Sequence, residues 1–337
     1  MKRRAAVAAV ALLGAAAPAA AAAPHAVFGL RAGGNPKLGY FVYPLRPGAA
    51  VSGSVIVSNA GTATGTVRLY AVDATTGATS GTVYRTSRRP GAAGSWIALA
   101  SSRLTLAPGA YAAVPFTVRA PAGARPGQWV GGIAAESPEG TSSRATGAKG
   151  SLRIRVRNLS IIGVEVDVPG PGALAFRIGA VRAGGADGYQ QLLLHVADTG
   201  ALLSRPAGTV TVARAGGKAV QTLRYSMDTF LPQTAIDYPL HLRTALGPGR
   251  YTAAVELHAR PLHGAGGAVV VRATRTFVIT SKQVRKVFSS APPTVRPAAG
   301  GGSPWTPAAA AAGGAGGALA LAGAGLLLLR RRRPATP

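Results

Sequence analysis

Apolar and polar residues alternate in short runs over most of the chain between residues 28 and 280. The runs are separated by Gly, Pro, Asn and Thr, which favour turns, and they recur about every 8 to 12 residues. No helical period of about 3.6 residues is sustained here, and strict alternation is typical of strands that bury one face. The clearest predicted strands span residues 51–58, 66–72, 103–106, 113–118, 128–134 and 152–156.

Short strands at this spacing, with no helices between them, predict an all-β fold of Ig-like antiparallel β-sandwiches. The chain of 337 residues is long enough for about two such domains. Prolines and glycines at 169–172 would interrupt strand pairing, so we predict one sandwich over residues 27–165 and a second over 166–280. Residues 281–307 contain many Pro and Gly residues and predict an extended linker.

The two predicted sandwiches carry signs of an internal repeat. Asn59 is echoed by Asp198, and the Pro-Gly-x-Tyr sequence that begins at Pro108 is echoed at Pro248. Asn59 lies 49 residues before Pro108, and Asp198 lies 50 residues before Pro248, so the nearly equal spacing indicates a repeated module. The alternative is coincidence, because Pro-Gly-x-Tyr is an ordinary turn followed by a strand. We expect the Asn59 and Asp198 side chains to cap turns, and Gly131-Gly132 to mark a bulge or a close backbone approach.

Both ends of the chain carry targeting patterns. Residues 1–26 combine three cations, an apolar run and a region of small residues, as a secretory signal peptide does. Residues 308–329 are uncharged and, as a helix, would span about 33 Å, enough to cross a bilayer. Four arginines follow, so we predict a cytoplasmic tail at 330–337 and an extracellular body on a single membrane anchor. Residues 303–307 do not contain a sortase signal of the LPxTG type, so the anchor is expected to be retained.

The net charge of +27 comes from 37 Lys and Arg residues against 10 Asp and Glu. The signal and the tail hold seven of the cations, and residues 27–280 hold 26 cations and all 10 acids, which leaves +16 on the predicted extracellular body. Outside the membrane, wall polymers and lipid headgroups are the available polyanions, so we expect no nucleic-acid partner. The absence of cysteine excludes disulfides, thiolate metal sites and cysteine nucleophiles.

An ordered series of motifs runs through residues 28–165. It comprises Tyr40, Pro44, Pro47-Gly48, Ser58-Asn59, Val72-Asp73-Ala74-Thr75-Thr76-Gly77, Gly81-Thr82-Val83-Tyr84, Trp96, Leu104-Thr105-Leu106-Ala107-Pro108-Gly109, Pro121 and Pro126-Gly127-Gln128-Trp129-Val130-Gly131-Gly132-Ile133. This series resembles the N-terminal domain of the WxL-interacting protein family, which is described as peptidoglycan-binding. The resemblance implies an exported, membrane-anchored wall protein. Family members also carry a host-binding domain and partner with WxL proteins, but residues 166–280 do not show the pattern of that second domain.

Three arginines alternate with apolar residues in the last predicted strand of the first sandwich. Arg153, Arg155 and Arg157 fall on one face of this strand, at intervals of about 6 to 7 Å. Guanidinium groups spaced in this way suit repeated carboxylates or phosphates. The alternative is a solvated face that protects an edge strand.

A second candidate site combines aromatic and cationic residues around a predicted loop at 86–95. Its members are Tyr84, Arg85, Arg88, Arg89 and Trp96. An aromatic face with cations at its rim can bind a glycan, and loops allow such groups to converge. The alternative is that Trp96 belongs to the core of the sandwich and that the arginines are a solvated loop tip.

No enzyme or metal signature is found. The chain lacks HExxH, GxSxG, SxxK and a Walker loop, and two carboxylates that lie near each other, Glu136 and Glu139, fall in a predicted loop. Four histidines in the second half (195, 241, 258 and 263) have no recognised ligand spacing, so we predict no catalytic residues, cofactor or metal.

The sequence therefore predicts a non-enzymatic surface protein whose first sandwich binds peptidoglycan or another anionic wall polymer. The alternative is an adhesin or assembly scaffold that binds another surface protein through its Ig-like domains.

Overall fold

The computed structural model describes residues 24–34, 39–87, 89–137, 141–147, 150–156, 158–264 and 266–288. For residues 141–147 and 150–156 it describes the backbone alone. The predicted membrane helix and tail, the linker beyond residue 288 and the predicted signal peptide up to residue 23 lie outside these residues. Within the described ranges, no helix is both long enough and apolar enough to cross a membrane. All the described residues belong to one compact unit, Met1–Ser290.

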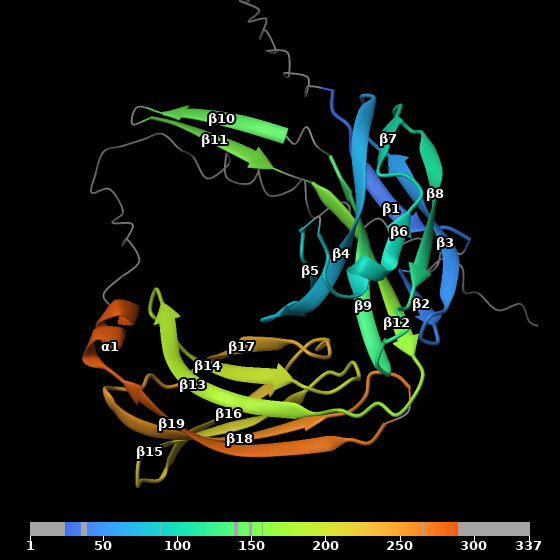
Figure 1. Cartoon of the computed structure of the whole chain (residues 1–337). Helices are drawn as coiled ribbons and strands as arrows, with labels where there is room; N and C mark the ends of the chain where they lie inside the picture. The colour runs from blue at the N-terminus through green and yellow to red at the C-terminus, as the bar shows by residue number, and fades with distance from the viewer. Residues whose placement is uncertain are drawn as a thin grey trace, which may run out of the picture. The chain divides into compact units, whose positions relative to one another are not determined.

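The first half of the unit is a sandwich of two sheets (Figure 1). One sheet has the order β1-β3-β8-β6, formed by β1 (Phe28–Ala32), β3 (Ala50–Asn59), β8 (Tyr111–Arg119) and β6 (Ile97–Leu99). The other has the order β2-β12-β9-β4-β5, formed by β2 (Tyr40–Pro44), β12 (Leu159–Val168), β9 (Gly127–Glu136), β4 (Gly65–Gly77) and β5 (Gly81–Tyr84), with β7 (Arg103–Leu106) also paired to β4. Alternate residues of both sheets meet in one apolar core, which includes Val55, Val57, Phe116, Ile133 and Val164.

The second half repeats this arrangement. One sheet has the order β13-β14-β17, formed by β13 (Phe176–Ala186), β14 (Tyr189–Asp198) and β17 (Ala235–His241). The other has the order β16-β15-β18-β19, formed by β16 (Ala219–Ser226), β15 (Ala207–Arg214), β18 (Gly249–Ala259) and β19 (Val269–Ile279). Its core includes Leu192, Leu194, Val210, Tyr251 and Leu257. Every second residue of β14 from Gln190 to Asp198 is buried, as the alternating sequence requires.

The all-β prediction is confirmed, and each of the six predicted strands lies within an observed strand. One pairing differs from the purely antiparallel sandwich that we expected. After β1 the chain crosses to the opposite sheet, where β2 runs parallel to β12, with Tyr40 opposite Gly163. The first sandwich also continues past the predicted boundary at 165/166, because β12 ends at Val168.

The two sandwiches share one pattern of strand pairing, so the predicted repeat is present. Of its two sequence signals, the Pro-Gly-x-Tyr match was wrong. Strands β1, β3, β4, β5, β8, β9 and β12 correspond in their pairing to β13, β14, β15, β16, β17, β18 and β19. Pro248-Gly249 begins β18, whose counterpart β9 begins at Gly127, so Pro126-Gly127 is its equivalent and not Pro108-Gly109. Gly127 and Gly249 share a positive φ, at 137° and 155°. The first sandwich contains three Pro-Gly pairs next to a strand, before β3, before β8 and at the start of β9, so spacing alone selected the wrong one.

A short helix follows the second sandwich, where we expected an extended linker. Residues Ser281–Phe288 form α1, and Val287 is only 3% exposed. Thr280 and Gln283 form a capping box: Gln283 N–H donates to Thr280 Oγ1 over 3.2 Å, and Thr280 N–H donates to Gln283 Oε1 over 2.8 Å. The capped end and the buried valine fix this helix against β13 and β14.

Between β9 and β12 the chain forms a separate two-stranded hairpin, β10 (Thr141–Gly147) and β11 (Gly150–Val156). The hairpin is antiparallel, with Thr141 opposite Val156 and Arg144 opposite Arg153. Because β9 and β12 also pair with each other, up to Glu136 opposite Leu159, the hairpin follows directly from the end of that ladder. Within the described residues neither β10 nor β11 pairs with any other strand.

Candidate functional site

Buried hydrogen bonds around Gln128, at the start of β9, join the two sandwiches. Gln128 Oε1 accepts a bond of 2.6 Å from the main-chain N–H of Leu203, and Gln128 N–H donates to the carbonyl of Ala201 over 2.8 Å. Gln128 Nε2 also donates to Glu165 Oε1 at 3.3 Å. The preceding Gly127 permits this approach, since a Cβ there would lie 2.7 Å from the carbonyl oxygen of Ala201. Gln128 is therefore a bridge between the halves, shielded from water.

A second polar bridge lies at Thr76, near the end of β4. The hydroxyls of Thr76 and Thr234 are 2.6 Å apart, and Leu231 N–H donates to Thr76 Oγ1 over 2.8 Å. Thr234 Oγ1 in turn donates to the carbonyl of Leu231 over 2.7 Å. Each polar atom in this small network has a partner, so it binds the second sandwich to the first without leaving a buried group unsatisfied.

A cavity of about 430 Å³ lies beside both bridges and is lined by residues of both sandwiches. Its wall combines the cations Arg85 and Arg125, the carboxylate of Asp73, the indole of Trp129 and the side chain of Gln233. This mixture of an aromatic surface with convergent polar groups is typical of sites that bind small ligands. Its volume falls within the range of about 300 to 1,000 Å³ that is typical of small-ligand pockets.

Asp73 organises the loop that forms one wall of this cavity. Its carboxylate accepts main-chain hydrogen bonds from Gly91 (2.7 Å), Ala92 (3.1 Å) and Gly94 (2.8 Å). Gly94 also needs its lack of side chain, because a Cβ there would lie 2.5 Å from the carbonyl carbon of Val72. The loop predicted at 86–95 is therefore held to β4 by one carboxylate, a role that the sequence analysis did not assign.

Of the aromatic and cationic cluster, Arg85 lines the cavity and Tyr84 does not. Tyr84 packs on the sheet, where a Cβ on Gly132 would lie 2.9 Å from its Cε1 and one on Gly163 would lie 2.6 Å from its hydroxyl. Burial raises the pKa of Tyr84 above its ordinary value. β9 pairs through Gly131 and Gly132 without a shift in register, so the glycines mark a close approach and not a bulge.

Trp96 is half-buried and packs on the core of the first sandwich. Its ring lies 5.3 Å from that of Trp129, and Trp129 Nε1 donates to the carbonyl of Arg125 over 3.0 Å. The aromatic residue at the cavity is thus Trp129, supported from behind by Trp96. Trp129 could have been found because the motif at 126–133 already contained it, but the sequence could not show which tryptophan lines the cavity.

The remaining predicted site residues do not gather at the cavity. Arg89 is exposed in the loop, where its N–H donates to Ser87 Oγ over 3.3 Å, and it does not line the cavity. Arg88 and Arg157 lie outside the described residues. Arg153 and Arg155 are in β11, opposite Arg144 and Ser142. The arginine row predicted from alternation is therefore placed in a hairpin strand.

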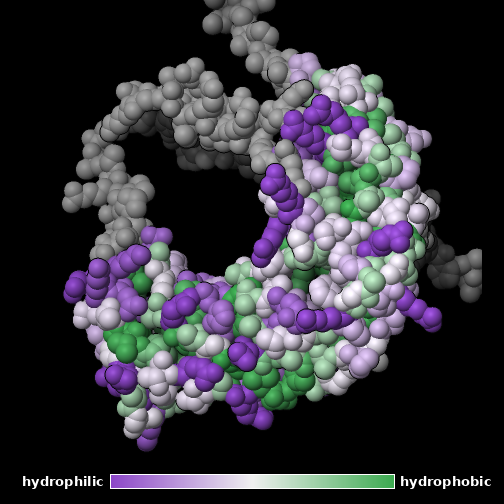
Figure 2. Space-filling view, viewed as in Figure 1, coloured by the Kyte–Doolittle hydropathy of each residue, from purple (hydrophilic) through white to green (hydrophobic). Residues whose placement is uncertain are grey.

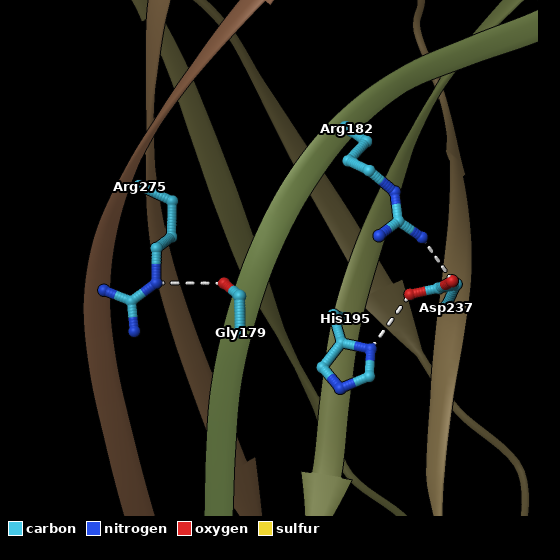
Figure 3. A network of polar contacts seen from close by, with 5 residues as sticks. All are labelled: Gly179, Arg182, His195, Asp237 and Arg275. Atoms are coloured by element: carbon cyan, nitrogen blue, oxygen red, sulfur yellow. Dashed lines mark hydrogen bonds and ion pairs between the residues drawn. The ribbon is translucent and has the colours of Figure 1, made fainter.

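The second sandwich carries a polar network on the face of its three-stranded sheet (Figure 3). Asp237 pairs with Arg182 at 2.5 Å and with His195 Nδ1 at 3.0 Å. The hydrogen bond from His195, aided by Arg182, lowers the pKa of Asp237. Arg275 of β19 donates to the carbonyl of Gly179 over 2.9 Å, at the point where the register of β13 shifts. These contacts connect strands, and the charged partners range from exposed (Arg182) to half-buried (His195, Asp237 and Arg275).

Over the face seen in Figure 2, hydrophilic and apolar residues are interspersed on both sandwiches. Among the side chains that the structure describes, the most exposed large apolar ones are Tyr189 (74%) and Tyr111 (70%), one on each sandwich. Such single exposed aromatic residues are ordinary on a protein surface.

No protein-family model matches the chain, and no curated protein matches it. Among solved structures, the chain is similar to a chaperone–tip adhesin complex of CFA/I fimbriae biogenesis (9% identity, TM-score 0.37, covering 74% of this chain and 98% of the other). It is also similar to the class 5 fimbriae chaperone CfaA (8%, 0.35, 72% and 98%). A third similarity is to the CsuC–CsuE pre-assembly complex of Csu pili from Acinetobacter baumannii (10%, 0.33, 73% and 97%).

Proposed function

We propose that this chain is an exported, membrane-anchored and non-enzymatic assembly protein, and that its first sandwich binds an extended segment of another surface protein along the β10–β11 hairpin. The observation that carries the proposal is the pairing of the hairpin, since within the described residues β10 and β11 pair only with each other. Each strand thus has an outer edge of main-chain donors and acceptors. An extended segment that pairs with such an edge is a common way to bind a polypeptide.

The hairpin's composition supports strand addition. Leu152, Ile154 and Val156 alternate with arginines along β11, so apolar and cationic positions fall on opposite faces. A two-stranded hairpin is only marginally stable by itself in water, and a third strand increases the apolar area that it can bury. The hairpin is therefore better suited to pair with a partner than to remain alone.

The charges favour an acidic partner. Arg144 lies opposite Arg153, and Arg155 is two positions further along β11, so cations of both strands share one face. A partner strand that carries carboxylates would bring charges of opposite sign to these arginine positions. We therefore expect a surface protein with a segment that alternates acidic and apolar residues.

The experiment places a photo-crosslinking amino acid at Ser143 of β10 in the full chain, on intact producing cells. The matched control is the same group at Val220, which is 45% exposed on β16, an edge strand of the second sandwich. We expect one discrete protein adduct from Ser143, with saturable binding when that protein is purified and mixed with the full chain. Equal adducts from Ser143 and Val220, or none from Ser143, would contradict the proposal.

A second candidate function, peptidoglycan binding, is favoured by one observation: Trp129, Arg85 and Arg125 line the same cavity. An indole can stack on a sugar ring while cations bind the carboxylates of the peptide stem. Sedimentation of the full chain with purified sacculi tests this function. Retention that falls in Arg85→Ala, but not in Arg89→Ala, supports wall binding at the cavity, and equal retention of the parent and both variants contradicts it.

A further inference from the structure

Three metal-ligating side chains from the two sandwiches converge at the junction. Glu165 and Asp167 lie two positions apart on β12, hence on one face of the sheet, and His263 lies in the segment between β18 and β19. One ligand atom of each lies within 4.8 Å of those of the other two. His263 Nε2 is 2.6 Å from Glu165 Oε1, although 98 positions separate the residues in the sequence.

The charges of this group are not balanced by the protein. Glu165 is only 4% exposed, and Asp167 Oδ1 is buried without a hydrogen-bond partner. Two carboxylate groups this close together in a buried site are costly unless a cation lies beside them.

We propose that Glu165, Asp167 and His263 bind a zinc ion, which links β12 of the first sandwich to the β18–β19 segment of the second. One imidazole nitrogen with two carboxylate oxygens is a ligand set that zinc accepts, whereas calcium and magnesium prefer oxygen alone. Two carboxylates and a neutral imidazole balance the charge of a divalent cation. A water molecule completes a tetrahedral site.

The geometry requires only small adjustments. Ligands at about 2.0 to 2.2 Å from zinc lie about 3.3 to 3.6 Å apart in a tetrahedron. The Glu165–His263 pair, now 2.6 Å apart, must therefore open slightly, and the widest separation, up to 4.8 Å, must close. Gln128 orients Glu165, because Gln128 Nε2 donates a hydrogen bond to Glu165 Oε1. Gln128 Oε1 in turn accepts a hydrogen bond from the main-chain N–H of Leu203. Such a second hydrogen-bonded layer orients the ligands of metal sites.

The second sandwich, which contains His263, also has a histidine beside a glutamate that lacks a third ligand. His258 Nε2 lies 2.5 Å from Glu256 Oε1, and Arg272 Nε occupies the other carboxylate oxygen at 2.7 Å. Among the residues that the structure describes, no other group of three His, Asp or Glu side chains converges as these three do. His258→Gln is therefore a control for nonspecific binding of metal to a histidine beside a carboxylate.

The test is isothermal titration of Zn²⁺ into the purified full chain after treatment with EDTA. We expect one Zn²⁺ per chain, an affinity at least about tenfold lower in Asp167→Asn and in His263→Gln, and no change in His258→Gln. Absorption of added Co²⁺ in the visible region should show a low-symmetry site in the parent and lose intensity in both ligand variants. No saturable Zn²⁺ binding, an unchanged affinity in Asp167→Asn, or an equal loss in His258→Gln would overturn the proposal. If Asp167→Asn fails to fold by circular dichroism, the parent's Co²⁺ spectrum and the His263→Gln titration decide.

Discussion

Asn59 and Asp198 occupy equivalent positions in the two sandwiches, and each lies opposite a phenylalanine of the neighbouring strand. Asn59 is opposite Phe28 and Asp198 is opposite Phe176. Both side chains are 1% exposed, and both accept a turn N–H two residues on, from Gly61 at 3.0 Å and from Gly200 at 2.7 Å. They differ in the second atom: Asn59 Nδ2 donates to the carbonyls of Ala63 and Leu106, whereas Asp198 Oδ2 is buried without a partner.

This difference predicts that Asp198 makes stability depend on pH. Burial raises the pKa of Asp198 to about 7, with the bond from Gly200 opposing it, whereas an unfolded Asp has a pKa of about 3.9. Between these values the folded chain holds a proton that the unfolded chain has lost, so the free energy of unfolding falls as the pH rises from about 4 to about 7.

We expect Asp198→Asn to melt several degrees above the parent at pH 8 and to lose this part of the pH dependence. Thermal melts of both chains at pH 5 and pH 8 measure the change. Asp187→Asn is the control, because Asp187 is exposed and its φ of 50° suits asparagine. If the melting temperature changes by the same amount between pH 5 and pH 8 in the parent and in Asp198→Asn, the assignment is contradicted.

Asn59→Ala should destabilise the first sandwich strongly. The substitution leaves the main-chain groups of Val27, Gly61, Ala63 and Leu106 without the side-chain partner that now bonds to them. Leaving such groups unsatisfied costs about 1–3 kcal/mol for each one that water cannot reach. Urea denaturation should therefore give a loss of about 3 kcal/mol or more, and a loss below about 1 kcal/mol would show that the bonds matter little.

Thr76→Val tests the polar bridge between the sandwiches. The substitution keeps the shape of the side chain but removes the hydroxyl that bonds to Thr234 and accepts from Leu231. We expect a loss of about 1–3 kcal/mol in the free energy of unfolding. Thr66→Val is the control, because Thr66 and Thr105 also pair hydroxyl to hydroxyl, at 3.0 Å, but on an exposed surface. Similar losses in the two variants would mean that burial at the junction adds nothing.

Asp73→Asn should loosen the loop at the cavity. The three main-chain donors that now bond to the carboxylate, at Gly91, Ala92 and Gly94, would keep a weaker, uncharged acceptor. We expect amide hydrogen exchange at 91–94 to become at least about tenfold faster, corresponding to about 1.4 kcal/mol. Exchange in β15, within the second sandwich, is the internal reference. Unchanged exchange at 91–94 would show that the Asp73 carboxylate does not hold this loop.

Alternation along the chain predicted the strands and the two sandwiches because half-buried strands impose a period of about two residues. It could not predict the parallel pairing of β2, which depends on a crossover after β1. The Thr280-x-x-Gln283 pattern of a capping box is present in the sequence, but the glycines and prolines beyond it favoured the prediction of a linker.

The candidate site was predicted less well than the fold. Arg85 could be selected by its chemistry, whereas Trp129 and Arg125 reach the cavity only because β9 begins at the junction. Gln128, Glu165 and His263 come from distant parts of the sequence and show no spacing pattern, so only folding brings them together. A single sequence contains strand periodicity but no record of such contacts.

Amide hydrogen exchange on the full chain, alone and bound to the purified protein that crosslinks at Ser143, tests the central claim most directly. Strand addition predicts slower exchange along one outer edge of the hairpin, in 141–147 or in 150–156, with little change around Arg85 and Trp129. Protection confined to the residues that line the cavity, with the hairpin amides unchanged, would contradict it.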